Sequence, residues 1–227
     1  NYIPDAEPSG KVMVVGAGKG SAEMARAYEE AWKKKGYKDL SGLVITRYGH
    51  KKICKNIKII EASHPVPDKA GLDATRQLIK LIKTLNKEDL LIVLISGGGS
   101  SLLVAPIDGV SLEEKQELTN SLLKCGASIS EINSVRKHLS KVKGGNLASY
   151  AYPAKIITLA ISDVPGDDFG TIASGPTYPD NTTCLKALAV LDKYKISCSK
   201  NIYDSLNSET NETPDKQDKI FDRSDFK

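Results

Sequence analysis

The sequence predicts an α/β fold, with a doubly wound, mostly parallel sheet and helices on both faces, as in Rossmann-like domains. Short apolar segments alternate with helical patterns up to about residue 200, an order typical of parallel strands joined by right-handed crossovers. The segment Leu90-Leu91-Ile92-Val93-Leu94-Ile95 is apolar throughout, as expected of a central strand covered on both faces. Glycine-rich loops follow two of the apolar segments.

Five strands are predicted from these apolar segments. They cover residues 11–15, 42–46, 57–61, 90–95 and 156–161. Each is short, bounded by turn-forming residues and rich in Val, Ile and Leu.

Helices are predicted between the strands. The patterns run over residues 21–35, 112–125, 131–150 and 183–194. Another helix begins behind Asp68, which we interpret as its N-cap, and carries apolar residues on one face as far as Leu85. The pair Gly144-Gly145 interrupts the 131–150 pattern.

The chain divides by composition near its end. Residues 1–204 are predicted to form the Rossmann-like domain. Residues 205–227 are rich in Asn, Ser, Thr, Asp and Lys, so we interpret them as a polar linker or extension.

Composition narrows the classes of partner. The net charge is only +4, and basic runs such as Lys33-Lys34-Lys35 fit solvated helix faces, so nucleic acid is not an expected partner. No apolar run reaches the roughly 20 residues that span a bilayer. The four cysteines are scattered without metal-ligand spacing, which indicates a cytoplasmic protein. Whether the chain forms a homo-oligomer stays open.

Polar and glycine-rich segments follow four of the predicted strands. They are GAGKG, SHPVPD, SGGGSS and SDVPGDD. Because ligands of parallel α/β sheets bind beyond the carboxyl ends of the strands, we expect these segments to meet at one edge and form a site.

The GAGKG segment offers a tight turn and a positive charge. Gly18 allows close approach of the backbone to a ligand, and Lys19 lies where a helix N-terminus favours anions. An ordinary turn with a solvated lysine is the alternative. No Ser or Thr follows Lys19 as a Walker A loop requires. Ser21 replaces the third glycine of a dinucleotide fingerprint, and Thr46-Arg47 replaces the acidic residue that binds the ribose. These differences disfavour an NAD site, whereas an NADP site is merely compatible with them.

The SGGGSS segment is the more specific signal. Three consecutive glycines cost backbone entropy, and a bend needs only one. Their amides, flanked by hydroxyls, would form an anion cradle. The residues of this predicted cradle are Ser96, Gly97, Gly98, Gly99, Ser100 and Ser101.

Acidic residues follow the fifth strand. Asp163, Asp167 and Asp168 bring like charges together, which calls for a metal ion or a shared proton. Mg²⁺ prefers such oxygen ligands and is commonly shared with phosphates. Asp168 also fits a simple turn or cap.

Four further candidates lie on a helix and in a loop. Asn133 and Lys137 share a helical face with Arg136 beside them, which fits either a solvated surface or a guanidinium fork for a carboxylate or phosphate. His64 lies between a strand end and two prolines, so it is a binding or catalytic candidate, with a structural role as the alternative.

Five motifs in order resemble a known family. GAGKG, EASHPVPD, LISGGGSSLL, INSVRKHLSKVKGG and ISDVPGDDFGTIASGPT resemble the N-terminal domain of the glycerate 2-kinase family, sometimes called the MOFRL family, some members of which were labelled hydroxypyruvate reductases. The resemblance covers roughly residues 11–196. Family members continue into a second, C-terminal domain, which this chain does not include.

The resemblance implies an enzyme and assigns its residues. The family uses ATP and a divalent cation such as Mg²⁺ to phosphorylate the 2-hydroxyl of D-glycerate, which gives 2-phosphoglycerate. Its active-site lysine corresponds to Lys19, its phosphate loop to residues 96–101 and its acidic loop to Asp163 and Asp167. Its basic helix corresponds to Asn133, Arg136 and Lys137.

Two alternatives to the kinase stay open. One is an NADP-dependent hydroxypyruvate reductase. The other is a ligand-binding domain that is inactive without its second domain.

Overall fold

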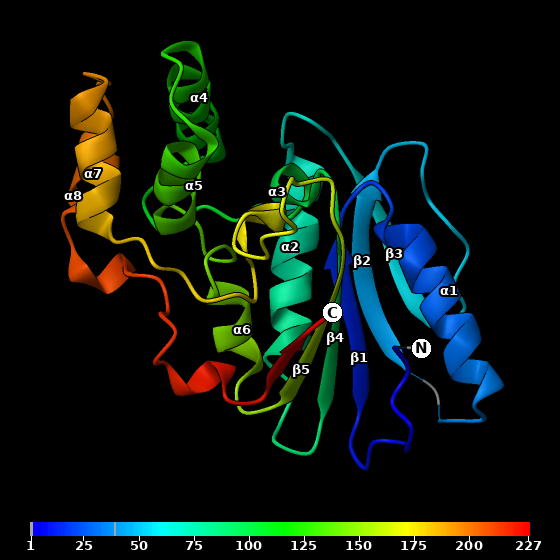
Figure 1. The fold of residues 1–227 in the computed structure, drawn as a ribbon. Coiled ribbons are helices and arrows are strands. Elements are labelled where there is room, and N and C mark those ends of the chain that lie inside the picture. The colour runs from blue at the N-terminus through cyan, green and yellow to red at the C-terminus, as the bar shows by residue number, and fades with distance from the viewer. Residues whose placement is uncertain (1, 39) are drawn as a thin grey trace.

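One parallel sheet of six strands, in the order β3-β2-β1-β4-β5-β6, organises the part of the chain that the computed structural model describes, residues 2–38 and 40–227 (Figure 1). The strands are β1 (Val12–Ala17), β2 (Ser41–Arg47), β3 (Ile57–Ala62), β4 (Leu90–Ser96), β5 (Lys155–Ile161) and β6 (Ser224–Phe226). This order is the doubly wound arrangement in which the chain reverses direction across the sheet between β1 and β4.

Helices cover both faces of the sheet. The α-helices are α1 (Ser21–Lys34), α2 (Lys69–Ile82), α3 (Gly99–Leu102), α4 (Leu112–Lys124), α5 (Ile129–His138), α6 (Asn146–Ala151), α7 (Cys184–Lys193) and α8 (Lys200–Leu206). Short 3₁₀ turns lie at Ile172–Ser174, Glu209–Asn211 and Lys219–Phe221. The helix α1 packs on one face through Ala25, Tyr28 and Trp32. The helices α2 and α6 pack on the other, through residues such as Leu78 and Leu147.

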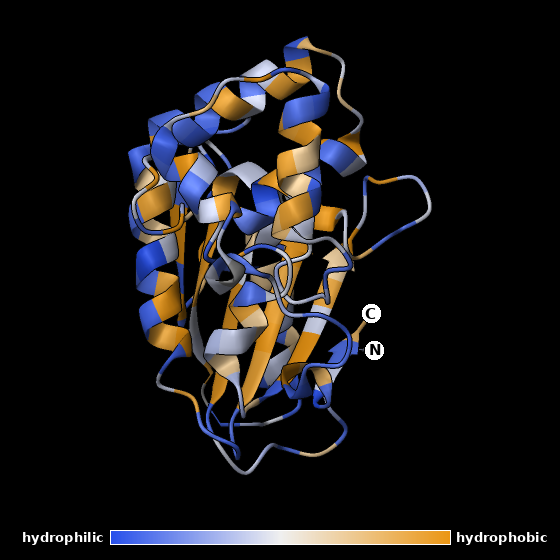
Figure 2. Cartoon of the chain, turned by 90° about the vertical axis from the view of Figure 1, so that its left-hand side faces the viewer, coloured by the Kyte–Doolittle hydropathy of each residue, from blue (hydrophilic) through white to orange (hydrophobic). Residues whose placement is uncertain are grey.

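A separate helical unit stands beside the sheet. Figure 1 shows α4, α5, α7 and α8 grouped at the side of the sheet next to β5. They share a hydrophobic cluster of their own, which includes Leu122, Val135, Leu191 and Leu206. The strands themselves form the apolar centre of the molecule, as the orange strands in Figure 2 show. Within the described residues, no helix is long and apolar enough to cross a membrane.

The predicted fold class and all five predicted strands are confirmed, and Asp68 is the N-cap of α2, where its carboxylate accepts from the amide of Gly71. The single helix expected over residues 131–150 is wrong. It divides into α5, which ends at His138, and α6, which begins at Asn146. Gly144 and Gly145 both adopt positive φ, 56° and 84°, which a continuous helix cannot contain.

The tail differs from a simple linker. Its last residues form β6, which pairs in parallel with β5. Phe226 of β6 packs against Tyr178 and Phe169, with ring centroids 5.1 and 5.5 Å apart. The sequence misses this strand because only three residues form it and charged residues surround them. The domain boundary at residue 204 stays a prediction.

Candidate active site

The loops that follow β1 and β4 meet where the strand order reverses. The amide of Lys19 donates to the carbonyl of Gly97 (2.8 Å). The amide of Gly20 donates to the hydroxyl of Ser96 (3.0 Å), which also shares a hydrogen bond with Ser21. These bonds join the GAGKG and SGGGSS segments at the carboxyl edge of the sheet, as the strand-end argument predicts.

These loops require glycine because neighbouring atoms lie where a Cβ would be. Gly18 has a φ of 152°, and a Cβ there would lie 2.1 Å from Oγ of Ser96. A Cβ on Gly97 would lie 2.0 Å from Oδ2 of Asp163. Gly98 has a φ of 81°, and its Cβ would lie 2.7 Å from Nε2 of His64. The glycine run therefore lets the Asp163 and His64 side chains lie directly against the loop.

Lys19 forms a charged cluster with its neighbours over this end of the loop. Its ammonium lies 3.6 Å from Oδ2 of Asp163, and the two side chains are 42% and 57% exposed. Burial, followed by the positive charges of Lys19 and Arg47, lowers the pKa of His64 below its usual 6.5. His64 is therefore neutral at neutral pH and can accept a proton.

The amides of Gly97 and Gly98 complete this end of the loop. In the part of the chain that the structure describes, neither donates a hydrogen bond in a turn or loop. Amides next to a lysine ammonium are suited to bind the oxygens of an anion. We call Lys19, His64, Gly97, Gly98 and Asp163 the lysine end of the loop.

Two cations contact the other end of the loop, the half-buried Arg136 and the buried Lys143. Arg136 donates from Nη2 to the hydroxyl of Ser100 (2.6 Å). The ammonium of Lys143 donates to the carbonyl of Ser100 (2.7 Å) and to its hydroxyl (3.1 Å). Ser174 shares a 2.7 Å hydrogen bond with the same hydroxyl. We call Ser100, Arg136 and Lys143 the arginine end of the loop.

Buried lysines make the arginine end unusual. Lys143 is 1% exposed and Lys115 is 6% exposed, and the Lys115 ammonium donates to the carbonyls of Leu139 and Arg136. Burial, and then the charge of Arg136, holds the pKa of each lysine well below its usual value. Among the described residues, no carboxylate forms an ion pair with Lys115, Arg136 or Lys143.

A pocket of about 270 Å³ opens beside these cations. Its lining includes Ser100, Ser101, Lys115, Arg136 and Lys143, with apolar residues such as Val66, Val104 and Leu123. A larger hollow of about 810 Å³ lies between α2 and residues 105–116. Its lining includes Pro67 and Asp68 after β3 but none of the residues that follow β1, β4 and β5. We therefore assign the smaller pocket, which Ser100 and Arg136 line, to the arginine end of the loop.

Several predicted residues have contacts within the protein. Asn133 accepts a hydrogen bond from Ser174, and the hydroxyl of Ser101 donates to the carbonyl of Gly98. Ser96 is 4% exposed and holds the two loops together. These hydrogen bonds hold the loops of the site in position. Their predicted contact with a ligand stays a prediction.

Lys137 forms an ion pair within the protein, and its predicted contact with a ligand stays a prediction. Its ammonium lies 3.0 Å from Oδ1 of Asp180, and the two side chains are 9% and 1% exposed. A buried ion pair of this kind is costly to break. The structure therefore places Lys137 in a structural pair, whereas Lys143, which the sequence analysis did not single out, contacts Ser100.

Of the three aspartates in the loop after β5, only Asp163 contacts the glycine loop. Asp163 faces Gly97 and Lys19. Asp168 accepts from the amide of Gly170 and the hydroxyl of Thr171, which fits the expected turn. Asp167 is exposed with a φ of 53°. Within the described residues, the three carboxylates do not form a three-ligand metal group, so the metal assignment to Asp163 and Asp167 stays a prediction.

Comparison with known proteins identifies relatives over most of the chain. Residues 3–207 match the family model described as "Domain of unknown function (DUF4147)". The D-glycerate 2-kinase of Thermotoga maritima is 48% identical over 88% of this chain and 48% of its own length. A protein of Agrobacterium vitis with the provisional name hydroxypyruvate reductase is 50% identical over 94% of this chain and 48% of its own length.

A solved structure has the same fold. The crystal structure of glycerate kinase from Thermotoga maritima superposes with a TM-score of 0.88 at 43% identity, over 98% of this chain and 51% of that chain. These matches confirm the resemblance to the glycerate 2-kinase family. The chain spans about half the length of the curated relatives it matches.

Proposed function

We propose, from the premise that this chain belongs to the DUF4147 domain family, that it forms the substrate-binding half of an ATP-dependent D-glycerate 2-kinase. The reaction transfers the γ-phosphoryl group of ATP to the 2-hydroxyl of D-glycerate and gives 2-phosphoglycerate. The relatives' names support the reaction class, and the geometry supports the assignment of residues.

One observation carries the assignment: a single glycine loop has a positively charged site at each end. Lys19 and the amides of Gly97 and Gly98 lie at one end, and Arg136 and Lys143 surround Ser100 at the other. A hydroxy acid that receives a phosphoryl group carries a carboxylate and a reacting hydroxyl, and two positively charged groups on one loop offer a partner for the carboxylate and for the phosphoryl group.

The lysine end would hold the transferred phosphoryl group. Catalysis of phosphoryl transfer is mostly positioning and neutralisation of charge. Lys19 and the glycine amides supply donors where negative charge develops. The arginine end would hold the carboxylate of glycerate, because guanidinium and ammonium groups bind carboxylates strongly when shielded from water.

A divalent cation fits next to Lys19. Mg²⁺ is bound through one or two carboxylates together with the phosphates of the substrate. Asp163, whose carboxylate lies against Gly97, would be one ligand, with Asp167 as the second. When bound, the ion would neutralise charge on the phosphate oxygens.

The proton of the reacting hydroxyl needs an acceptor. As the hydroxyl oxygen bonds to the γ-phosphorus, the bond to ADP breaks and the proton leaves the hydroxyl. His64 is neutral at neutral pH and lies against Gly98, so we assign it as the acceptor, in preference to Asp163. The four cysteines are free thiols, which is consistent with a cytoplasmic enzyme.

The reductase alternative fits the loops less well. A dinucleotide pyrophosphate binds amides at the N-terminus of the first helix. Here the amides of Lys19 and Gly20 already donate to Gly97 and Ser96. Ser21 also occupies the third glycine position and is completely buried.

A coupled assay on the full gene product tests the proposal. With D-glycerate, ATP and Mg²⁺ we expect ADP release that depends on glycerate. With hydroxypyruvate and NADPH we expect no oxidation of the nucleotide. Oxidation of NADPH without ADP release would establish the reductase instead, and ligand binding without either product would establish the binding domain.

A further inference from the structure

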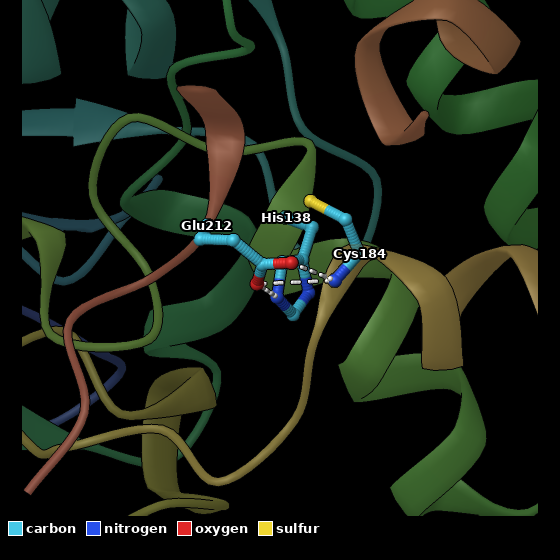
Figure 3. A group of neighbouring side chains, drawn as sticks. All are labelled: His138, Cys184 and Glu212. Atoms are coloured by element: carbon cyan, nitrogen blue, oxygen red, sulfur yellow. Dashed lines mark hydrogen bonds and ion pairs between the residues drawn. The ribbon is translucent and has the colours of Figure 1, made fainter. Parts of the chain in front are cut away.

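We propose that His138, Cys184 and Glu212 form a zinc site, which is separate from the proposed active site. Their ligand atoms, one from each side chain, all lie within 4.8 Å of one another. His138 ends α5, Cys184 begins α7, and Glu212 precedes the tail that leads to β6. Figure 3 shows the three side chains converging, with the Glu212 carboxylate beside the His138 ring.

The surroundings of His138 require a positive charge at its Nε2 atom. The side chain is completely buried, and Nδ1 lies 2.8 Å from the carbonyl oxygen of Ser134. Because a carbonyl only accepts, Nδ1 carries a hydrogen, and in the neutral ring Nε2 presents its lone pair. This is the tautomer, held by a backbone carbonyl, that metal-binding histidines adopt.

Two oxygen atoms lie next to Nε2. Oε2 of Glu212 lies 3.3 Å from Nε2. Oγ1 of Thr213 lies 3.4 Å away, and it donates its own hydrogen to Asp180 (3.0 Å). A nitrogen lone pair, a carboxylate and a hydroxyl oxygen therefore converge, and a cation between them would satisfy all three. A proton on Nε2 could satisfy these atoms instead of a metal ion, and the Cys184 thiol distinguishes the two alternatives.

Cys184 supplies the ligand that selects the metal. Its side chain is 2% exposed, and burial, followed by the charge of Glu212, raises the pKa of its thiol to about 12. A proton on His138 needs no thiol nearby, whereas Zn²⁺ binds a mixed nitrogen, sulfur and oxygen set well. Binding would displace the thiol proton into solvent, as is usual for zinc thiolates.

The three ligand atoms must move slightly closer together to coordinate one zinc ion. In tetrahedral zinc sites, ligand atoms are roughly 3.5 Å apart, as metal–ligand distances of about 2.0–2.3 Å require. Glu212 can provide the movement because its side chain is 37% exposed and its segment lies at the surface. It also accepts hydrogen bonds from the amide of Cys184 (3.0 and 3.1 Å), so it is already placed at the N-terminus of α7.

The tail side of the cluster opens to the surface at Glu212. Glu212 lines an open hollow of about 400 Å³. The same hollow is lined by Asp215 and Asp218, whose carboxylates attract cations. The bound ion would connect α5, α7 and the tail, and would therefore fasten the helical unit to the segment that forms β6.

Zinc uptake by the purified chain tests the proposal, without glycerate or nucleotide, so that the result is independent of the proposed kinase activity. After incubation with ZnCl₂ and removal of unbound metal, elemental analysis should find one zinc per chain, and zinc should raise the thermal midpoint. With Co²⁺ as a probe, a sulfur-to-cobalt charge-transfer band should appear.

Matched variants assign the ligands. Cys184→Ser and Glu212→Gln should each weaken zinc binding at least tenfold, and Cys184→Ser should remove the cobalt band. Cys198→Ala, which removes another thiol of the same helical unit, should bind zinc as the wild type does. If Cys184→Ser does not fold, the partly exposed Glu212→Gln variant decides. Absence of bound zinc, or full binding by Glu212→Gln, would overturn the proposal.

Discussion

Lys143 is a buried ammonium beside the proposed carboxylate site, with three protein oxygens as its partners. It donates to the carbonyl and hydroxyl of Ser100 and to the carbonyl of Leu103 (3.3 Å). Burying a cation without a carboxylate partner is unfavourable for folding. This arrangement therefore favours a bound anion, and it indicates a residue whose role lies in substrate binding.

We predict that Lys143→Met raises the KM for glycerate by about 10–100-fold, because a charge-assisted hydrogen bond is worth about 1.5–3 kcal/mol. The free energy of unfolding should stay within about 1 kcal/mol of the wild-type value, since the lost hydrogen bonds and the removed buried charge offset each other. Steady-state kinetics and urea unfolding measure the two effects.

Lys141→Met is the matched control, since Lys141 pairs with Asp108 at the surface. Its KM should not change. An unchanged KM for Lys143→Met, together with a loss of stability, would show that Lys143 is purely structural.

His64 should titrate below its usual pKa of 6.5, chiefly because it is partly buried and then because Lys19 and Arg47 are positive. NMR titration of the imidazole measures this pKa. In Lys19→Met the pKa should rise, and in Asp163→Asn it should fall. Because the unfolded chain then binds more protons than the folded one, His64 makes stability decrease as pH falls below 6.5. An imidazole that titrates at or above 6.5 would contradict the assignment.

Among the site residues, those that belong to a local sequence pattern can be identified from the sequence. Lys19 and the SGGGSS segment stand out because glycine runs and a lysine at a helix start are local signals. Lys143 does not stand out, because it meets Ser100 across 43 positions of sequence. The pairing of Lys137 with Asp180 likewise depends on tertiary packing, which helical spacing alone does not reveal.

At the element scale, the turn between β1 and α1 depends on one glycine more than on the others. Gly18→Ala should destabilise the protein by about 2 kcal/mol or more, because the residue has a φ of 152° and its Cβ would meet Ser96. Gly20→Ala is the matched control. Its Cβ would have ordinary contacts at 3.5 Å, so stability should change little. Equal effects of the two substitutions in urea unfolding would refute this explanation.

Elements with strong local signals are predictable, and those without are not. The strand β4 and the N-cap at Asp68 follow from composition and position alone. The break between α5 and α6 depends on two glycines that a helix pattern can tolerate. Tertiary contacts hold these glycines in place, since the amide of Gly145 donates to the carbonyl of Gly175 (2.8 Å).

For the whole molecule, the tail is an integral part of the sheet. Phe226→Ala should lower the free energy of unfolding by about 1–2 kcal/mol, because it removes aromatic contacts with Tyr178 and Phe169. Thermal and urea unfolding measure the loss. Tyr203→Ala, at an exposed position in α8, should have little effect. A Phe226→Ala protein as stable as the wild type would restore the linker interpretation.

The most direct test of the proposed function is the identity of the phosphorylated product. When the full gene product is incubated with D-glycerate, ATP and Mg²⁺, ³¹P NMR should show 2-phosphoglycerate. Lys19→Ala should remain folded and form it about 10²–10³-fold more slowly, the usual cost of removing one donor that stabilises transition-state charge. Formation of 3-phosphoglycerate, or a Lys19→Ala variant as fast as the wild type, would contradict the account.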